Sequence, residues 1–218
     1  MSWDSHYALL ALPVLARGLW ITIVATVLSF ALAAVLGLLI VLAEMIPSRT
    51  VRTLVRGSEH FIRGTPLLVQ LFFLYYVLPY LDVTLPALGC GIFGLGVHYA
   101  AYLSQVYRAG IAGVPPLQWE AARACNLTRT QTWVHIVLPQ ALKPSFPVMG
   151  NYLIALLKET PILSSITIMD MMGEANTFGD LHYRYLEPVT LVGILFLSIG
   201  LLARWVTGTV YRLLSNPV

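Results

Sequence analysis

The sequence predicts an all-α integral membrane protein, with one domain over residues 1–218 and five membrane-spanning helices. Its composition supports this class, because 58% of the residues are hydrophobic and only 11% are charged, against about 25% charged residues in soluble domains. The chain also contains several apolar runs that are each about 20 residues long, which is the length that a helix needs to cross a bilayer. The net charge of +3 is too small to indicate a nucleic-acid partner. We expect the chain to be surrounded by membrane lipid.

Hydropathy places the five spans at about residues 18–43, 55–81, 85–110, 145–169 and 188–211. The first span is almost purely aliphatic, and residues 7–17 before it should form a short amphipathic helix at the membrane interface. The first residues lack the basic start of a signal peptide, so we expect this span to remain in the chain. The third span is rich in glycine and alanine, which indicates close helix packing.

Two spans contain breaks. The second is interrupted by Arg63-Gly64-Thr65-Pro66, and the fourth contains Lys158-Glu159-Thr160-Pro161. A proline removes a helix hydrogen bond, so Pro161 should bend the fourth span. Backbone groups freed in this way are tolerated in a membrane only where protein or water covers them, as in the broken helices that line transporter sites.

The charges of the loops predict the orientation. One set of loops contains mostly basic residues, namely Arg49, Arg52, Arg56, Arg108, Arg123, Arg129, Lys143, Arg204 and Arg212. The opposite set is mainly acidic, with Asp4, Asp82, Asp170, Glu174, Asp180 and Glu187. Because basic loops stay in the cytoplasm, we expect a bacterial inner (cytoplasmic) membrane protein with the amino terminus outside and the carboxyl terminus in the cytoplasm.

The cytoplasmic loop at about residues 112–140 is the most informative segment. Pro115-Pro116 should end the third span, and residues 117–127 should form a short polar helix. Thr128 is a candidate N-cap for a second helix over residues 129–138, and Pro139 and Pro144 should set the entry to the fourth span. A stiff helix–turn–helix that is joined to a membrane span at each end is suited to transmitting the movement of a partner protein to the spans. The alternative is an ordinary amphipathic interfacial helix.

The spacing of Glu120-Ala121-Ala122, Asn126 and Ile136-Val137-Leu138-Pro139 resembles the "EAA loop" of permease subunits of ATP-binding-cassette (ABC) importers. This resemblance implies a coupling helix that docks on a cytoplasmic ATPase. The family usually has glycine where this chain has Asn126, and both residues tolerate a left-handed backbone. The implied coupling residues are Glu120, Ala121, Ala122, Asn126, Ile136, Leu138 and Pro139. Ile136 and Leu138 are expected to anchor the segment under the bundle.

Three more segments resemble the polar amino-acid branch of these permeases, a histidine/glutamine/arginine permease-like family. They are residues 61–70 (FIRGTPLLVQ), 101–111 (AYLSQVYRAGI) and 151–161 (NYLIALLKETP). Gln105 stands where a glutamate is common, and Pro161 replaces a serine. The resemblance implies the type I importer permease fold, a pair of permeases (homo- or heterodimer) over an ABC ATPase dimer, and an extracytoplasmic substrate-binding protein. Residues 185–193 faintly resemble permeases for the compatible solute ectoine.

Polar groups within the spans predict a translocation path, because such groups are expensive in lipid and normally face a cavity or a protein partner. A path offering both charge signs and amides is suited to a zwitterion, such as a polar amino acid. The candidate path or gate residues are Arg63, Thr65, Pro66, Gln70, Tyr102, Gln105, Asn151, Lys158, Glu159 and Thr160.

Simpler roles compete with this prediction at several of these positions. Arg63 could extend to the lipid headgroups or act in gating or packing. Lys158 and Glu159 could form a mutual or intersubunit ion pair, although adjacent helical residues point about 100° apart. Asn151 could make a hydrogen bond between helices.

The sequence predicts no enzyme. It contains no nucleophile elbow, carboxylate dyad or G-x-x-x-x-G-K-[ST] phosphate loop, so ATP and Mg²⁺ should be held by the partner ATPase and this chain should bind no cofactor. Cys90 and Cys125 lie far apart without a ligand cluster, so we expect no metal site. A stand-alone secondary carrier or channel subunit for small polar solutes is the alternative function, but a carrier should show an internal repeat, and none is clear here.

Overall fold

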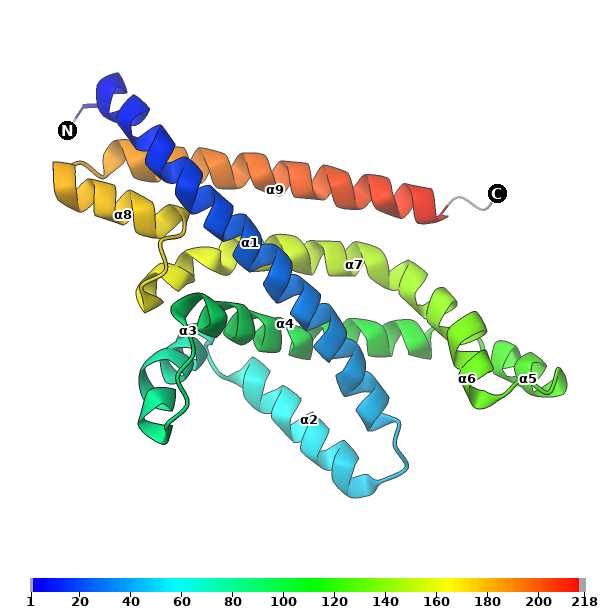
Figure 1. Cartoon of the computed structure of the whole chain (residues 1–218). Helices are drawn as coiled ribbons and strands as arrows, with labels where there is room; N and C mark the ends of the chain where they lie inside the picture. The colour runs from blue at the N-terminus through cyan, green and yellow to red at the C-terminus, as the bar shows by residue number, and fades with distance from the viewer. Residues whose placement is uncertain (1, 216–218) are drawn as a thin grey trace.

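The computed structural model describes residues 2–215, and the regular elements within this range are all helices (Figure 1). Three single helices are long and apolar enough to cross a membrane: α1 (Ser5–Glu44), α4 (Ala87–Ala112) and α9 (Leu186–Ser215). Two bent pairs bring the number of candidate spans to five. The described part of the chain therefore accommodates five crossings, two of them through broken helices.

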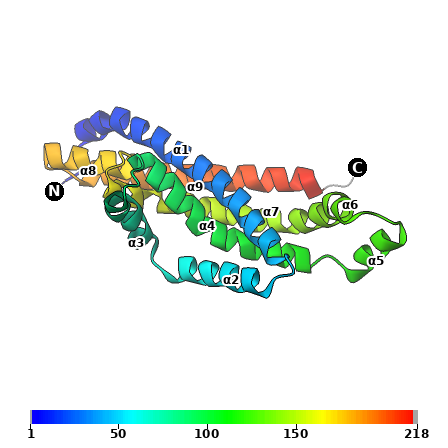
Figure 2. The same ribbon diagram turned by 60° about the horizontal axis from the view of Figure 1, so that its bottom comes forward.

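The helices form an elongated bundle. α4, α7 (Leu138–Glu159) and α9 run side by side, and α1 crosses α4 diagonally (Figure 1). α5 (Pro116–Ala124) and α6 (Arg129–Gln131) lie at one end of the bundle, and α8 (Met171–His182) lies at the opposite end (Figure 2). This arrangement places the polar segment between α4 and α7 beyond the apolar helices.

Small residues allow α1 to approach its neighbours closely. Gly37 lies so near α4 that a Cβ atom on it would be 3.0 Å from the Ala100 carbonyl oxygen, and Gly18 lies against the Asp170 backbone. The residues that α1 buries recur every three or four positions and are mostly small: Ala8, Ala11, Leu15, Gly18, Thr22, Ala25, Thr26, Ser29, Ala33, Gly37, Val41 and Glu44. Gly91, Gly94 and Gly96 of α4 are also buried, which confirms close helix packing there.

The first span is longer than predicted. Residues 7–17 are not a separate interfacial helix but the start of α1, which continues through Pro13. Packing explains this continuity, because Ala11 and Leu15 are fully buried against Met171 and Phe178 of α8.

The break predicted at residues 63–66, within the second span of residues 55–81, is confirmed. α2 (Arg49–Gly64) ends before Thr65, and the helical segment Leu67–Leu81 continues at an angle of 104°. That segment contains α3 (Leu67–Phe72), a π-helical stretch (Phe73–Val77) and a 3₁₀ turn (Leu78–Leu81). Thr65 and Pro66 are extended, as expected because a residue before proline avoids the helical region. The interruption predicted by the sequence is therefore a sharp corner.

The fourth span also differs from its prediction of residues 145–169. α7 begins at Leu138, and the chain changes to a 3₁₀ helix (Thr160–Ile166) next to Pro161, where a bend was predicted. The chain then turns by 48° into α8, which the sequence had suggested to be a loop. The Asp170 side chain caps α8 by accepting a hydrogen bond from the Gly173 N–H at 2.9 Å.

Candidate functional site

The polar segment between α4 and α7 folds as the predicted helix–turn–helix. Pro116 opens α5, where a missing N–H costs nothing. Asn126 has a φ of 53°, so it supplies the left-handed residue of the turn. Glu120 and Ala121 are exposed, whereas Ala122 is buried against this chain's own residues. Glu120 and Ala121 are therefore accessible from outside the bundle, whereas Ala122 has a packing position.

A capping box begins the second helix of this segment. The Thr128 side chain accepts a hydrogen bond from the Gln131 N–H, and the Gln131 side chain accepts one from the Thr128 N–H at 2.9 Å. From Arg129 the chain continues through α6 and a π-helical stretch (Thr132–Val137) directly into α7. Pro139, which is exposed, does not separate this segment from the span, because the π-helical turn immediately before it accommodates the missing N–H. The second helix of the polar segment is thus continuous with α7.

The predicted anchors Ile136 and Leu138 are only half-buried, and the main anchor is Val137. Val137 is fully buried in a small apolar cluster with Val114 and Ala141. The π-helical turn rotates this side chain into the cluster. Residues 136–138 are all apolar and similar in hydrophobicity. The sequence therefore does not indicate that the middle one, Val137, is the buried one.

Aromatic contacts fix the two short helices to each other. The rings of Trp119 in α5 and Trp133 in the π-helical stretch meet edge to face at 5.4 Å between centroids. Trp133 and Arg129 also line a groove of about 340 Å³ with Met45 and Pro47, which belong to the turn between α1 and α2. The polar segment is therefore adjacent to the end of α1 as well as continuous with α7.

Gln70 stabilises the corner between α2 and α3. Its Nε2 donates hydrogen bonds to the Ile62 carbonyl at 2.7 Å, the Thr65 carbonyl at 3.2 Å and the Thr65 hydroxyl at 2.6 Å. Its Oε1 lies 3.2 Å from His98 Nδ1 of α4. Of the four residues predicted here as path or gate residues, Thr65, Pro66 and Gln70 thus build the corner. Arg63 is half-buried, and its Nε has no hydrogen-bond partner among the described residues.

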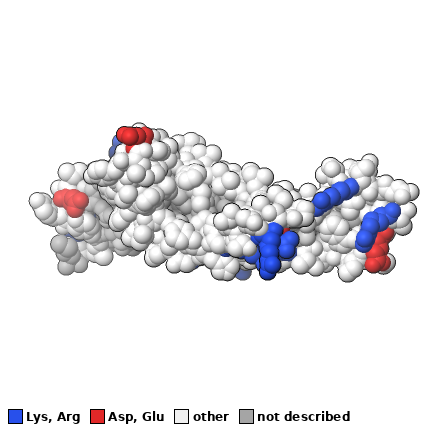
Figure 3. Space-filling model, turned by 90° about the horizontal axis from the view of Figure 1, so that it is seen from below, with Lys and Arg blue, Asp and Glu red and all other residues white. Residues whose placement is uncertain are grey.

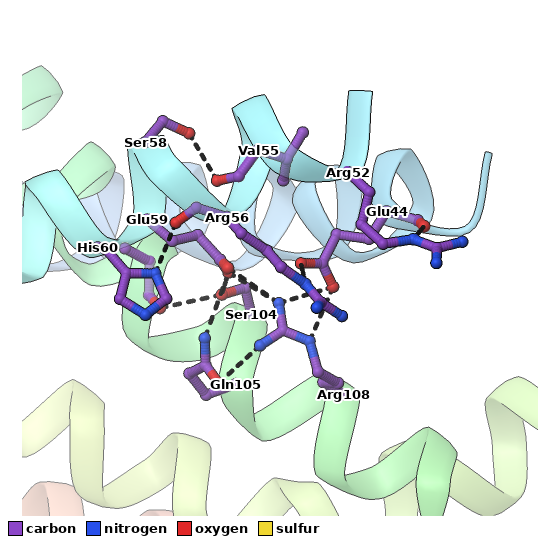
Figure 4. Close-up of polar contacts among 11 residues, drawn as sticks. Glu44, Arg52, Val55, Arg56, Ser58, Glu59, His60, Ser104, Gln105 and Arg108 are labelled. Carbon is purple, nitrogen blue, oxygen red and sulfur yellow. Dashed lines mark hydrogen bonds and ion pairs between the residues drawn. The ribbon is translucent and has the colours of Figure 1, made fainter. Parts of the chain in front are cut away.

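A charged network that the sequence analysis missed holds α1, α2 and α4 together (Figure 4). Arg108 of α4 forms ion pairs with Glu44 at the end of α1, at 2.8 Å, and with Glu59 of α2, at 3.0 Å. Glu59 is 1% exposed and Glu44 is 8% exposed. Arg56 adds an ion pair to Glu44 at 3.2 Å. Three elements thus share two buried carboxylates.

Two polar side chains complete this network. Ser104 donates a hydrogen bond to Glu59, and Gln105 accepts one from Arg108 at 2.6 Å. Gln105 was predicted as a path residue, but the structure places it within this network and beside a groove between α4 and α7. The sequence gives no signal for this network, because Glu59 lies in an amphipathic stretch and its burial appears only in the folded structure.

The other predicted path residues lie on α4 and α7. Asn151 and Lys158 line a groove of about 490 Å³ between α7 and α9, together with Arg204 of α9. Glu159, the residue after Lys158 in α7, is exposed. Neither Lys158 nor Glu159 forms an ion pair among the residues that the structure describes. Thr160 is buried and donates a hydrogen bond to the Leu157 carbonyl at 2.8 Å, so it caps the end of α7.

The opposite end of the bundle is held by a second charged contact. Arg184, in the turn between α8 and α9, pairs with Glu187 and donates a hydrogen bond to the Ser2 carbonyl at 2.7 Å. The hydrogen bond to Glu187 raises the pKa of the Arg184 guanidinium. This contact ties the start of the chain to the α8–α9 turn.

Comparison with known proteins identifies the architecture. The family described as "Binding-protein-dependent transport system inner membrane component" matches residues 37–216. A probable amino-acid ABC transporter permease protein of Sinorhizobium fredii is 40% identical over 207 residues, which cover 93% of this chain and 90% of that protein. An L-cystine transport system permease protein of Bacillus subtilis is 36% identical over 167 residues, covering 77% of this chain and 71% of the relative.

Solved structures agree with this result. The crystal structure of an amino acid ABC transporter with histidines contains a chain that matches with a TM-score of 0.89 and 31% identity, over 97% of this chain and 99% of that one. A chain of an inward-facing methionine ABC transporter matches with a TM-score of 0.79, over 93% of this chain and 97% of that one. Its sequence identity is only 20%, so it supports the fold alone. The chain therefore belongs to the family of binding-protein-dependent transport system inner membrane components, has the type I ABC importer permease fold, and is an amino-acid ABC transporter permease subunit.

Proposed function

We propose that this permease forms the translocation path for a polar amino acid or an amino-acid-like zwitterion, and that a partner ATPase drives it. The observation that carries the coupling role is the position of α5, which exposes Glu120 and Ala121 at one end of the bundle while α6 continues rigidly into α7. A rigid-body movement of a protein bound to α5 would be transmitted to α7 because no flexible linker intervenes.

The assumed orientation places α5 in the cytoplasm. Lys and Arg gather at and near the end formed by α5 and α6, where an acidic patch lies beside them, whereas the other acidic groups lie towards the opposite end, beyond a broad uncharged band (Figure 3). Basic groups favour the cytoplasmic side of a membrane. The amino terminus is then outside the bacterial inner membrane and the carboxyl terminus inside.

The proposed partners follow from this arrangement. An ABC ATPase dimer would bind α5 and hold the ATP and Mg²⁺. A second permease, identical or different, would complete the path, and an extracytoplasmic binding protein would deliver the substrate to the opposite end. A compatible solute such as ectoine fits the same zwitterionic class. Lys158, Asn151 and Arg204 supply a basic and amide-lined groove suited to a carboxylate.

Reconstitution in liposomes tests this function. The permease, its ATPase and its binding protein are combined in liposomes, with the ATPase and ATP on the inside. Uptake of a labelled polar amino acid into the liposomes is then measured. Uptake should require all three proteins and ATP. Uptake by the permease alone, driven by a solute or ion gradient, would instead identify a stand-alone carrier or channel.

A further inference from the structure

A groove lies where the end of α1 meets the helical segment that begins at Arg129. Its volume is about 340 Å³, and we call it the α1–α6 groove. One wall comes from α1 and the turn after it, and the other comes from α6 and the π-helical stretch. The lining residues are Leu42, Met45, Ile46, Pro47, Arg129, Thr130 and Trp133. The groove thus lies between one span and the segment that continues into another.

Most of this lining is apolar and open. Leu42 is 40% exposed and Ile46 is 48% exposed, although both lie at the end of a strongly apolar span. Trp133 is half-buried, and tryptophan is enriched at the level of lipid headgroups because its ring is apolar and its N–H is polar. Open apolar side chains beside such a ring are expected where a helix leaves the hydrocarbon of a bilayer.

The polar part of the groove is confined to Arg129 and Thr130. Both are exposed, and Trp133 follows Arg129 by four residues, about one helical turn closer to the span formed by α7. Leu42 belongs to α1, whereas Pro47 lies in the turn beyond it. A ligand that fills the groove therefore needs a polar group for Arg129 and an apolar chain that reaches the spans.

The charge of Arg129 is not compensated within the described part of the chain. Arg129 forms no ion pair there, and no acidic residue lines the groove. Glu44, the residue before Met45, is buried and already paired with Arg56 and Arg108. A guanidinium group matches the geometry of a phosphate, so the groove is complementary to an anionic headgroup.

We propose that the α1–α6 groove binds an anionic phospholipid, with the phosphate against Arg129 and Thr130 and an acyl chain along Leu42, Ile46 and Trp133. Basic pockets between membrane helices are suited to anionic headgroups. The ATPase is the competing occupant, but an open apolar wall that continues into a span favours lipid. This inference goes beyond the proposed function, since it depends neither on the substrate nor on the coupling role of α5.

Photochemical labelling tests the site. The complete transporter is placed in phosphatidylcholine nanodiscs that contain, at one low mole fraction, phosphatidylglycerol or phosphatidylcholine with a diazirine in the acyl chain. Adducts on residues 42–47 and 129–133 are measured by mass spectrometry of the digested permease. Phosphatidylglycerol should label these residues about fivefold more than phosphatidylcholine. A free anion on Arg129 gives no adduct, because the reactive group is in the chain.

Two results would overturn the proposal. The first is equal labelling of these residues by the two probes, which would mean that the groove does not select an anionic headgroup. The second is labelling that appears only when the ATPase is left out, which would mean that the ATPase covers the groove in the assembled transporter. The absence of adducts from both residue ranges in either sample would also exclude a lipid at this position.

Substitutions of exposed arginines separate the groove from the general charge of this end. Arg129→Gln should lower labelling by phosphatidylglycerol about fivefold, to the level of phosphatidylcholine, whereas Arg129→Lys keeps the charge and should retain most of the preference. Arg212→Gln is the matched control, because Arg212 is an exposed basic residue in the last turn of α9 and does not line the groove. It should leave labelling of the groove unchanged.

Each outcome of this series decides the question. Equal losses in Arg129→Gln and Arg212→Gln, or an intact preference in Arg129→Gln, would show that Arg129 does not hold the lipid. Labelling needs neither ATP nor substrate. Selective labelling in a transporter without ATP-dependent uptake of amino acids would contradict the proposed function alone, and normal uptake without selective labelling would contradict this inference alone.

Discussion

At the scale of single residues, the turn between α5 and α6 depends on the backbone of Asn126. Its φ of 53° lies in the left-handed region, which asparagine and glycine adopt readily and β-branched residues avoid. We expect Asn126→Gly to leave the turn intact and Asn126→Val to destabilise it by about 1–2 kcal/mol. The measurement is the amount of ATPase that co-purifies with each variant. Equal retention with glycine and valine would show that this backbone conformation does not matter for docking.

The network around Arg108 gives a second prediction at this scale. Arg108→Leu would leave Glu59, which is 1% exposed, buried without its cation, and breaking a buried pair costs about 3 kcal/mol. The double variant Glu59→Leu/Arg108→Leu should recover part of that loss, because it removes the unpaired charge. Thermal unfolding of the purified permease measures both.

Arg49→Leu is the control for this comparison. Arg49 is exposed at the start of α2, and surface substitutions usually stay within about 0.5 kcal/mol. A double variant less stable than Arg108→Leu alone would contradict the assignment, since it would mean that Glu59 stabilises the fold without Arg108.

At the scale of elements, glycine positions decide how closely helices pack. A Cβ atom at Gly110 of α4 would lie 2.5 Å from the Ala141 carbonyl oxygen of α7, whereas one at Gly57 of α2 would meet nothing within 4 Å. We expect Gly110→Ala to destabilise the permease by about 1–3 kcal/mol, and Gly57→Ala to stabilise it by about 0.5–1 kcal/mol. Thermal unfolding of the two variants should therefore shift in opposite directions. A Gly110→Ala variant as stable as the parent would mean that α4 and α7 separate easily.

The corner between α2 and α3 is the second test of an element. Gln70→Leu removes the three hydrogen bonds that its amide donates across the corner, and it should destabilise the permease by about 1–3 kcal/mol. Val69→Ala, at an exposed neighbouring position, should cost much less. Hydrogen exchange of the backbone at residues 62–67 measures local opening directly. Unchanged exchange in Gln70→Leu would indicate that the proline alone sets the corner.

At the scale of the whole molecule, the class of fold could be predicted because it depends on apolar content and span length, which are properties of sequence alone. The position of the helix–turn–helix was also predictable, since Pro116, Asn126 and Thr128 act on their own backbone. By contrast, the angle at Thr65–Pro66 could not be predicted, because Gln70 stabilises it through contacts that exist only after the corner has formed.

Contacts between distant segments explain the remaining differences. Glu59 lies in an amphipathic stretch and pairs with Arg108, 49 residues away, so periodicity gives no indication of the network. Val137 was missed because a π-helical turn changes which side chain of three is buried. The continuity of α1 through Pro13 depends on packing against α8, a helix that the loop-like composition of residues 170–182 conceals.

The central claim is that α5 is the docking element for the ATPase, and site-directed cross-linking tests it most directly. A single cysteine at Glu120, with Cys90 and Cys125 replaced, is treated with a short bifunctional cross-linker in membranes that contain the complete transporter. The control cysteine replaces Tyr80 at the opposite end of the bundle. The account predicts a cross-link to the ATPase from position 120 and none from position 80. A cross-link from position 80, or the absence of one from position 120 in an assembled and ATP-hydrolysing transporter, would contradict it.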